Sequence, residues 1–149
     1  MASYIRVANM EDLGFLDGLD PLLRRPILTE KVRQGEVYVA EVEGERVGLA
    51  RYQFFWDLDP FLTLIYVREA FRRQGIGTRL MEFWEQQMRE EGHRVLLTST
   101  QADESAQFFY RALGFADSGS ILFPGQAATE LVLIKQLRGF APGPSPREK

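Results

Sequence analysis

A glycine segment in the middle of the chain joins an apolar run to an amphipathic helix, and this junction limits the folds that the chain can adopt. The run at residues 61–67 has little polar alternation, which is typical of a strand buried on both faces of a sheet. From Gly75 onward, apolar residues recur at helical spacing, and Gly92 stands where a helix C-cap is expected. The segment Arg72-Arg73-Gln74-Gly75-Ile76-Gly77-Thr78 therefore leads from a buried central strand into a helix.

Strand and helix patterns follow one another along the rest of the chain. Asn9 followed by Glu11 and Asp12 predicts the cap and acidic first turn of a helix, and Pro21 and Pro26 interrupt the pattern after it. Further strands are predicted at residues 4–7, 37–42, 47–52, 95–99, 120–123 and 131–134, and further helices at 9–19, 29–33 and 103–113.

The turns between these elements set the fold class. Residues 43–46 and 124–125 predict hairpin turns, and residues 57–60 predict the turn that precedes the central strand. The order of elements predicts an α/β (α+β) domain with a mixed, mostly antiparallel sheet of about seven strands and about four helices.

Length and composition exclude several classes of protein. The 149 residues suit one domain, which we expect over residues 1–138, followed by a flexible tail over residues 139–149, where proline and glycine are frequent. A net charge of -3 gives no bulk positive field, so nucleic acid is not an expected partner. With no cysteine and one histidine, we expect neither a disulfide framework nor a metal site.

Signals for export or membrane insertion are not found in the sequence. The first residues lack the apolar stretch of a secretion signal, and no run approaches the roughly 18 apolar residues of a membrane span. We therefore expect a soluble, cytoplasmic protein without a membrane partner.

The start of the helix near Gly75 predicts an anion-binding site. Backbone N–H groups at a helix N-terminus lack intrahelical acceptors and carry the positive end of the helix dipole. Gly75 and Gly77 leave room for a pyrophosphate, and Arg72 and Arg73 can add charge-assisted hydrogen bonds. A P-loop would need Gly-Lys-Ser/Thr, and a dinucleotide fingerprint would need a third glycine where Leu80 stands, so neither motif fits.

Two motifs give the chain a family resemblance. The segment 72–77, Arg-Arg-Gln-Gly-Ile-Gly, resembles the pyrophosphate loop Arg/Gln-x-x-Gly-x-Gly/Ala of the GCN5-related N-acetyltransferase (GNAT) family. The segment 103–115 resembles the second family signature, Asn-x-x-Ala-x-x-Phe-Tyr-x-x-x-Gly-Phe, and departs from it only at Asp103. The resemblance runs from about Tyr4 to Leu137, with both motifs in the family's order.

The resemblance implies the GNAT fold, with a sheet that splays at its centre, and acetyl-coenzyme A as cosubstrate. The pantetheine arm would pair with exposed backbone like an added strand, and a backbone N–H near Ile65 would meet the acetyl carbonyl. The cofactor-binding residues that it implies are Ile65, Tyr66, Val67, Arg72, Arg73, Gln74, Gly75, Ile76, Gly77, Thr78 and Asp103.

Two residues of the second motif have both a functional and a structural interpretation. The resemblance implies that Tyr110 is the general acid that protonates the departing coenzyme A thiolate, whereas spacing alone favours an aromatic packed beside Phe109. The family's asparagine contacts the cofactor, but a carboxylate cannot donate a hydrogen bond, and Asp103 is also expected to be the N-cap of its helix, with Glu104 as the alternative cap.

The acceptor and the general base are not identified by the sequence. Direct transfer of acetyl to a primary amine is the favoured reaction, and Asp57, Asp59 and Glu41 are candidate bases. The aromatic residues around Asp57 could hold a cationic amine, or they could be core residues beside a solvated turn. His93 is expected to follow a helix end at the surface. A non-catalytic acyl-coenzyme A binding module and a nucleotide-binding protein are the alternatives. Because many members of the family form dimers, the resemblance also implies a homodimer.

Overall fold

The computed structural model describes residues 2–20 and 22–138, and within them seven strands form one sheet. The strands are β1 (Ser3–Val7), β2 (Val37–Val42), β3 (Glu45–Phe55), β4 (Asp59–Val67), β5 (Val95–Gln101), β6 (Ala116–Ile121) and β7 (Glu130–Gln136). Their order in the sheet is β1-β2-β3-β4-β5-β7-β6. β4 and β5 pair in parallel, whereas β1 with β2, β2 with β3, β5 with β7 and β6 with β7 pair antiparallel. The predicted mixed, mostly antiparallel sheet is therefore confirmed.

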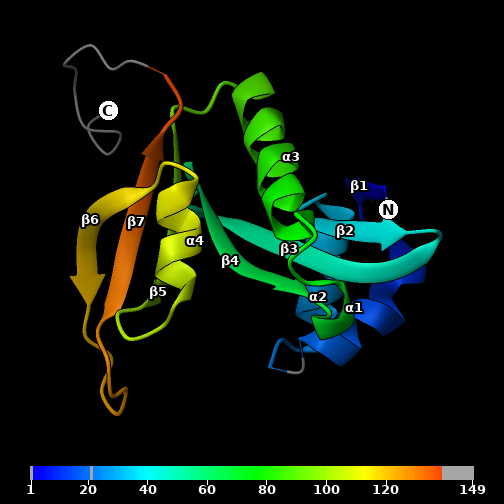
Figure 1. Cartoon of the computed structure of the whole chain (residues 1–149), viewed down its shortest axis with the longest axis horizontal. Coiled ribbons are helices and arrows are strands. Elements are labelled where there is room, and N and C mark those ends of the chain that lie inside the picture. The colour runs from blue at the N-terminus through cyan, green and yellow to red at the C-terminus, as the bar shows by residue number, and fades with distance from the viewer. Residues whose placement is uncertain (1, 21, 139–149) are drawn as a thin grey trace. The chain divides into compact units, whose positions relative to one another are not determined.

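Four α-helices lie within the described residues, as the sequence predicts (Figure 1). They are α1 (Leu13–Leu19), α2 (Arg25–Arg33), α3 (Ile76–Glu90) and α4 (Ala106–Ala112). Two short 3-10 helices, η1 (Met10–Asp12) and η2 (Glu69–Phe71), precede α1 and α3.

The chain divides into two compact units. Unit 1 holds the described residues up to Gln53 together with Thr63–Gln86, and unit 2 holds Phe54–Leu62 together with the described residues from Gln87. The prediction of a single domain over residues 1–138 stays a prediction, and the tail predicted for residues 139–149 lies outside the described residues.

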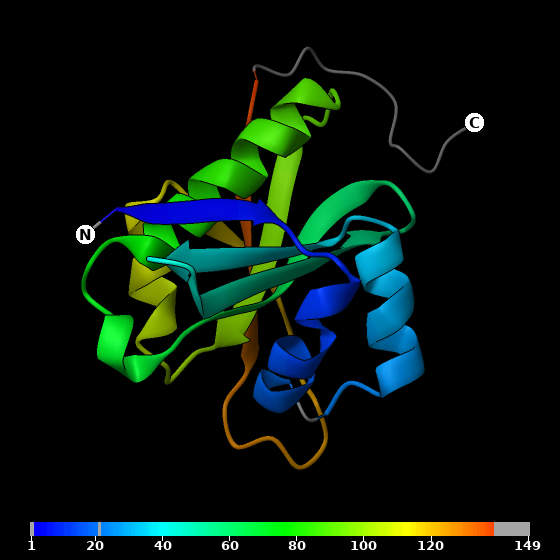
Figure 2. The same cartoon turned by 90° about the vertical axis from the view of Figure 1, so that its right-hand side faces the viewer.

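The sheet of unit 1 is covered on both faces. Val37 of β2 belongs to the same buried cluster as Leu16 of α1 and Leu28 of α2. The next residue, Tyr38, points to the opposite face, where its ring centroid lies 4.9 Å from that of Phe83 on α3. Figure 2 shows α1 and α2 on one side of these strands and α3 on the other. Because both faces are buried, the first four residues of β2, 37–40, are all apolar or aromatic and all buried.

Glycines end the helices as their positions predict. Gly92 has a φ of 87°, and the N–H of His93 donates to the Met88 carbonyl oxygen at 3.0 Å, which closes a Schellman motif after α3. Gly114 ends α4 with a φ of 98°. These caps confirm the predicted ends of both helices.

Helix α2 begins earlier than predicted. The predicted helix at residues 29–33 extends back to Arg25, and Pro26 lies in its first turn instead of interrupting the pattern. Proline suits this position because its fixed φ matches the helix and its missing N–H would have no intrahelical acceptor there.

One hairpin turn agrees with prediction and one is displaced. Glu43 and Gly44, with φ of 51° and 80°, form the tight turn predicted between β2 and β3. In the next hairpin, Trp56 and Asp57 take φ of 56° and 58°, and β4 already begins at Asp59. The prediction of the turn at residues 57–60 is therefore wrong by about one residue, because a two-residue turn of this hand matches the twist of the flanking strands.

Unit 2 has a long antiparallel ladder and a short parallel one. β5 and β7 pair along their whole length, from Val95 with Gln136 to Gln101 with Glu130. The parallel pairing of β4 with β5 consists of Phe61 with Leu97 and Leu62 with Thr98. Helix α4 packs against β5, as Figure 1 shows.

A buried carboxylate ties β1 of unit 1 to the first helical turn. The Asp12 side chain is fully buried, accepts hydrogen bonds from Arg6 Nη1 at 2.7 Å and Arg46 Nε at 2.6 Å, and also accepts from the Asn9 N–H at 2.8 Å. Burial alone would raise the pKa of Asp12, but these hydrogen bonds hold it well below its usual range. The Asn9 side chain accepts from the Glu11 N–H at 3.0 Å, so the predicted cap is confirmed. We call Arg6, Asp12 and Arg46 the closed arginine cluster.

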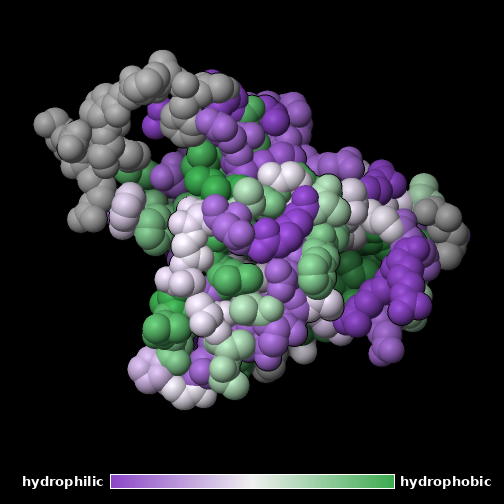
Figure 3. All heavy atoms as spheres, turned by 60° about the vertical axis from the view of Figure 1, so that its left-hand side comes forward, coloured by the Kyte–Doolittle hydropathy of each residue, from purple (hydrophilic) through white to green (hydrophobic). Residues whose placement is uncertain are grey.

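Several apolar side chains remain at the surface. Leu122 is 79% exposed and Phe108 is 65% exposed. On the face drawn in Figure 3, apolar and polar residues are intermixed, which is ordinary for a protein surface. Among the described residues, no helix is both long and apolar enough to cross a membrane.

Candidate functional site

The segment between β4 and α3 holds the predicted anion site, which lies in unit 1. Arg72 is exposed, yet its Nε donates to the Val67 carbonyl oxygen at 2.7 Å. Its Cζ lies 5.2 Å from the centroid of the Tyr66 ring, within the range of a cation-π contact. These contacts engage Nε and one face of the guanidinium, and the two terminal nitrogens carry its remaining N–H donors. The charge of Arg72 is thus held in place at the surface.

The backbone of this segment is strained. Arg73 has a φ of 64°, which costs a residue with a Cβ roughly 1–2 kcal/mol, and Gly75 follows with a φ of 80°. Strain of this kind is concentrated at functional sites, and such turns direct successive backbone N–H groups toward an anion. Gly75 adopts its conformation without that cost, because it lacks a side chain.

Helix α3 begins with amides that have no acceptor inside the helix. The first backbone hydrogen bond of the helix runs from the Arg79 N–H to the Gly75 carbonyl oxygen, at 3.0 Å. The N–H groups of Ile76, Gly77 and Thr78 precede it, at the positive end of a helix of 15 residues. We call residues 72–78 the open arginine loop. It combines the fixed guanidinium of Arg72, the strained turn and the start of α3.

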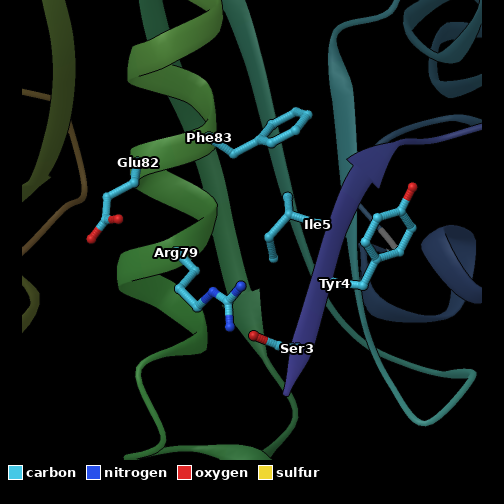
Figure 4. A pocket seen from close by; sticks show the side chains of 6 residues that line it. All are labelled: Ser3, Tyr4, Ile5, Arg79, Glu82 and Phe83. Carbon is cyan, nitrogen blue, oxygen red and sulfur yellow. The ribbon is translucent and has the colours of Figure 1, made fainter.

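A pocket of about 350 Å³ lies nearby in unit 1, between β1 and α3. Its lining residues are Ser3, Tyr4, Ile5, Arg79, Glu82 and Phe83. In Figure 4 the Arg79 guanidinium points toward Ser3 on β1. Arg79 is therefore a cation on the same helix as the open arginine loop, with its side chain directed at β1.

Tyr110 lies in unit 2, in the last turn of α4, and is 6% exposed. Its ring packs against Phe109 and Phe115, with centroids 5.4 Å and 5.9 Å away. Burial raises the pKa of the Tyr110 phenol, a side-chain hydrogen bond with Thr98 acts in the opposite direction, and the charge of Glu104 adds to the rise. The phenol is therefore protonated at neutral pH, as a general acid must be. Packing of Tyr110 against Phe109 and Phe115 is therefore compatible with a role as general acid.

The sequence did not indicate that the buried Thr98 would influence the pKa of Tyr110. Thr98 is 1% exposed on β5, and its Oγ1 donates to the Leu62 carbonyl oxygen at 3.2 Å. The available signal was a hydroxyl within the buried apolar run Val95-Leu96-Leu97-Thr98, because a buried hydroxyl requires a hydrogen-bonding partner.

The predicted cap of α4 is wrong. The N-cap is Ser105, its side chain makes no capping hydrogen bond, and Asp103 and Glu104 both precede it. The Glu104 N–H donates to the Gln101 carbonyl oxygen at 3.0 Å, so a backbone turn after β5 occupies the positions where the cap was expected. Asp103 is exposed in that turn.

The three candidate bases occupy different surroundings. Glu41 forms an ion pair with Arg6 and so supports the closed arginine cluster. Asp57 is exposed in the strained turn beside Phe55 and Trp56, whose ring centroids lie 4.6 Å apart. Asp59 is half-buried at the first position of β4. His93 stacks on Phe54 at 5.4 Å, after the end of α3.

The predicted site residues fall into two groups. Unit 1 holds Ile65, Tyr66 and Val67, the last three residues of β4, together with the open arginine loop. Unit 2 holds Tyr110 and Asp103. Within unit 1, the structure brings Arg72 together with Tyr66 and Val67, as a single site requires.

The sequence was compared with protein families and with curated proteins. The model of a family described as "Acetyltransferase (GNAT) family" matches residues 7–115. No curated protein matches the sequence.

Solved structures similar to this chain include three acetyltransferases. Ard1 from Thermoplasma volcanium has a TM-score of 0.80 and 20% identity, covering 93% of this chain and 100% of that chain. The ribosomal-protein-S18-alanine N-acetyltransferase from Escherichia coli has a TM-score of 0.76 and 18% identity, covering 94% and 97%. The PaiA N-acetyltransferase from Thermoplasma acidophilum, in complex with coenzyme A, has a TM-score of 0.74 and 15% identity, covering 91% and 99%. These likenesses establish a shared fold.

Proposed function

Because the chain belongs to the GNAT acetyltransferase family, we propose that it transfers the acetyl group of acetyl-coenzyme A directly to a primary amine of a small molecule or peptide. The observation that carries the proposal is the open arginine loop. Its strained backbone, its helix amides and the fixed Arg72 guanidinium together suit a ligand with paired phosphates.

The loop would hold the pyrophosphate of the cosubstrate. The N–H groups of Gly75, Ile76, Gly77 and Thr78 and the guanidinium groups of Arg72 and Arg73 would donate to the phosphate oxygens. Gln74 lies within the same loop, and Asp103 would take the place of the family's asparagine without donating a hydrogen bond. Binding at this end positions the thioester at the other end of a long, flexible cosubstrate.

The end of β4 would stabilise the tetrahedral oxyanion. In this proposal the backbone near Ile65, Tyr66 and Val67 pairs with the pantetheine arm, and an N–H near Ile65 donates to the developing oxygen anion. One such donor is typically worth about 3 kcal/mol in related acyl-transfer sites. This role needs no particular side chain.

Tyr110 would supply the proton for the leaving group. A protonated phenol whose pKa is raised by burial donates to a thiolate, whose conjugate thiol has a reference pKa near 8.5. The amine must lose a proton before it attacks, directly or through water, and Asp57, Asp59 and Glu41 are the candidates. Glu41 is already engaged with Arg6, which favours the two aspartates.

A thiol-release assay tests the proposal. Purified protein is incubated with acetyl-coenzyme A and a panel of polyamines, amino sugars and peptides, and free thiol is measured against hydrolysis without amine. Peptides with N-terminal alanine belong in the panel because the similar Escherichia coli structure is an alanine N-acetyltransferase. We expect amine-dependent thiol release and an acetylated product. Binding of acetyl-coenzyme A with no release for any amine would instead support a non-catalytic acyl-coenzyme A module.

A further inference from the structure

Gly48 stands buried in the interior of β3, between the buried residues Val47 and Leu49. Glycine weakens a strand at such a position, because it adds no packing and loses more backbone entropy on folding than any other residue. The φ of Gly48 lies outside the left-handed region, so the backbone conformation does not require glycine. The reason for a glycine at position 48 therefore lies in the space around it.

The space beside Gly48 is occupied by the last residues of β4. A Cβ at position 48 would lie 2.9 Å from the Tyr66 carbonyl oxygen, 3.4 Å from Val67 Cγ2 and 3.6 Å from the Cβ of Ala40, its register partner on β2. Carbon–oxygen contacts between strands usually measure about 3.3–3.6 Å, so the first of these contacts is too short. The atom in the way belongs to the backbone and cannot rotate aside as a side chain can. A side chain at position 48 would therefore displace the end of β4.

Hydrogen bonds hold the two strands together next to this contact. The N–H of Arg68, directly after β4, donates to the carbonyl oxygen of Val47 at 2.8 Å. The Arg68 side chain also reaches β3, where its Nη1 donates to the Glu45 carboxylate at 3.1 Å. These bonds draw the end of β4 toward β3, and the missing side chain of Gly48 leaves room for the approach.

The two β4 residues that approach Gly48 are also the two that hold Arg72. The Arg72 Nε donates to the Val67 carbonyl oxygen at 2.7 Å, and its Cζ lies 5.2 Å from the centroid of the Tyr66 ring. All of these residues belong to unit 1. A displacement of the Tyr66 peptide would consequently move the support of the Arg72 guanidinium as well.

We propose that Gly48 is a positioning residue for acetyl-coenzyme A. The space that it leaves open sets the position of the β4 end, which would pair with the pantetheine arm, and of the Arg72 guanidinium, which would bind the pyrophosphate. The proposal rests on the function proposed above, because it requires acetyl-coenzyme A to bind along β4 and the open arginine loop. Gly48 acts only through Tyr66 and Val67, and it lies outside both motifs of the sequence.

Gly48→Ala tests the proposal by adding one methyl group against the Tyr66 carbonyl oxygen. We expect the affinity for coenzyme A to fall about tenfold and kcat to fall about tenfold, because a misplacement of about 1 Å in a binding site can cost up to a hundredfold in rate. Titration calorimetry with coenzyme A measures the affinity, and the thiol-release assay with acetyl-coenzyme A measures kcat.

Val47→Ala is the matched variant that separates positioning from stability. It removes buried apolar atoms at the neighbouring position of β3 and so lowers stability, but it keeps the carbonyl oxygen that accepts from Arg68 and adds no atom beside β4. The thermal midpoint should fall in both variants, whereas affinity and kcat should fall only in Gly48→Ala. Equal losses of affinity in the two variants would overturn the proposal.

Gly18→Ala controls for the substitution itself. A Cβ at position 18, in α1, would meet nothing within 4 Å, so the affinity for coenzyme A should not change. A tenfold loss in Gly18→Ala as well would show that the effect does not depend on the contact with β4, and it would likewise overturn the proposal.

NMR of the free protein tests the close approach without any ligand. In the natural protein we expect a nuclear Overhauser effect between a Gly48 α-proton and the Val67 methyl protons, and its absence would contradict the approach. Gly48→Ala should shift the amide signals of Tyr66 and Val67 and the Nε–H signal of Arg72, and unchanged signals would contradict the proposal too.

The two proposals fail in distinguishable ways. If the natural protein bound no coenzyme A, the proposed function would fail, and the role of Gly48 in binding would fail with it. If the natural protein bound coenzyme A and Gly48→Ala bound it equally well with the same kcat, the role of Gly48 alone would be refuted.

Discussion

Unit 1 contains two arginine sites that differ in the source of the anion. In the closed arginine cluster, Arg6 and Arg46 surround the Asp12 carboxylate, which is fully buried and also accepts a backbone N–H. In the open arginine loop, Arg72 and Arg73 stand beside the first amides of α3. Within the described residues, neither of these two arginines forms an ion pair with a carboxylate.

Similar groups thus stabilise the fold in one site and, in the proposed function, bind a ligand in the other. Arginine beside a helical N-terminus attracts negative charge in both sites. Where the chain supplies the charge, the site joins β1 to η1 and stabilises the fold. In the open arginine loop the chain supplies no such carboxylate, and under the proposed function a ligand would supply the negative charge. The closed site should therefore respond to mutation in its unfolding free energy, and the open site in its affinity for coenzyme A.

The largest expected effect is on stability, in the closed arginine cluster. Asp12→Ala leaves Arg6 and Arg46 without their shared carboxylate, so the unfolding free energy should fall by about 3–5 kcal/mol. Urea denaturation measures it. The control is Asp17→Ala, which removes an exposed ion pair with Arg25 and should cost no more than about 1 kcal/mol. Equal losses of unfolding free energy in the two variants would show that the buried cluster stabilises the protein no more than an exposed ion pair.

The next effect is on affinity, in the open arginine loop. Gly77→Asp places a carboxylate among the helix amides, where it competes with a pyrophosphate and repels it, so coenzyme A affinity should fall at least about a hundredfold. An acidic residue in the first turn of a helix is favourable for the helix itself, so the thermal midpoint should not fall. Titration calorimetry measures the affinity.

Gly77→Asn is the matched variant for this test. It has nearly the size of the aspartate but no charge, so its affinity for coenzyme A should lie between those of the natural protein and Gly77→Asp. If both variants bound as tightly as the natural protein, the loop would not be the anion site.

A smaller effect is expected from removing one cation of the loop. Arg72→Gln should weaken coenzyme A binding about tenfold, because a charge-assisted hydrogen bond is lost, and the affinity should depend less on salt. The side chain of Arg79, on the same helix, points toward Ser3 on β1. Arg79→Gln removes this cation and should therefore change the affinity for coenzyme A little. Comparable losses in both variants would indicate a general charge effect in place of a specific contact.

The smallest expected effect is in the pH dependence of stability. Hydrogen bonds from the two arginines hold the folded pKa of Asp12 below the value of about 3.9 expected in the unfolded chain. The stability that this shift contributes is present above the unfolded pKa and is lost as pH falls toward the folded pKa. The unfolding free energy should therefore decline on acidification below about pH 5, and the decline should be shallower in Asp12→Asn. If the unfolding free energy of Asp12→Asn and that of the natural protein declined identically with pH, Asp12 would not be the source of the pH dependence.

Much of the fold follows from local chemistry in the sequence. Gly92 and Gly114 mark helix ends because the left-handed cap conformation favours glycine, and Glu43-Gly44 predicts a tight hairpin for the same reason. The junction that leads from β4 through the open arginine loop into α3 was also predictable, since its arginines and glycines are contiguous in the chain. Where neighbouring residues determine the structure, the sequence alone is informative.

The errors and omissions arise from contacts between distant residues. Arg46 reaches Asp12 across 34 positions, and Thr98 reaches Leu62 across 36, so no local pattern reveals either contact. The predicted cap at Asp103 failed because a backbone turn after β5 delays the start of α4. Short acceptor side chains suit turns as well as caps, and the sequence does not distinguish the two.

The most direct measurement is a crystal structure of the protein with coenzyme A. We expect pyrophosphate oxygens within hydrogen-bonding distance of the backbone N–H groups of residues 75–78, with at least one terminal nitrogen of Arg72 donating to them. A pyrophosphate bound elsewhere, with the amides of the loop facing only water, would contradict it.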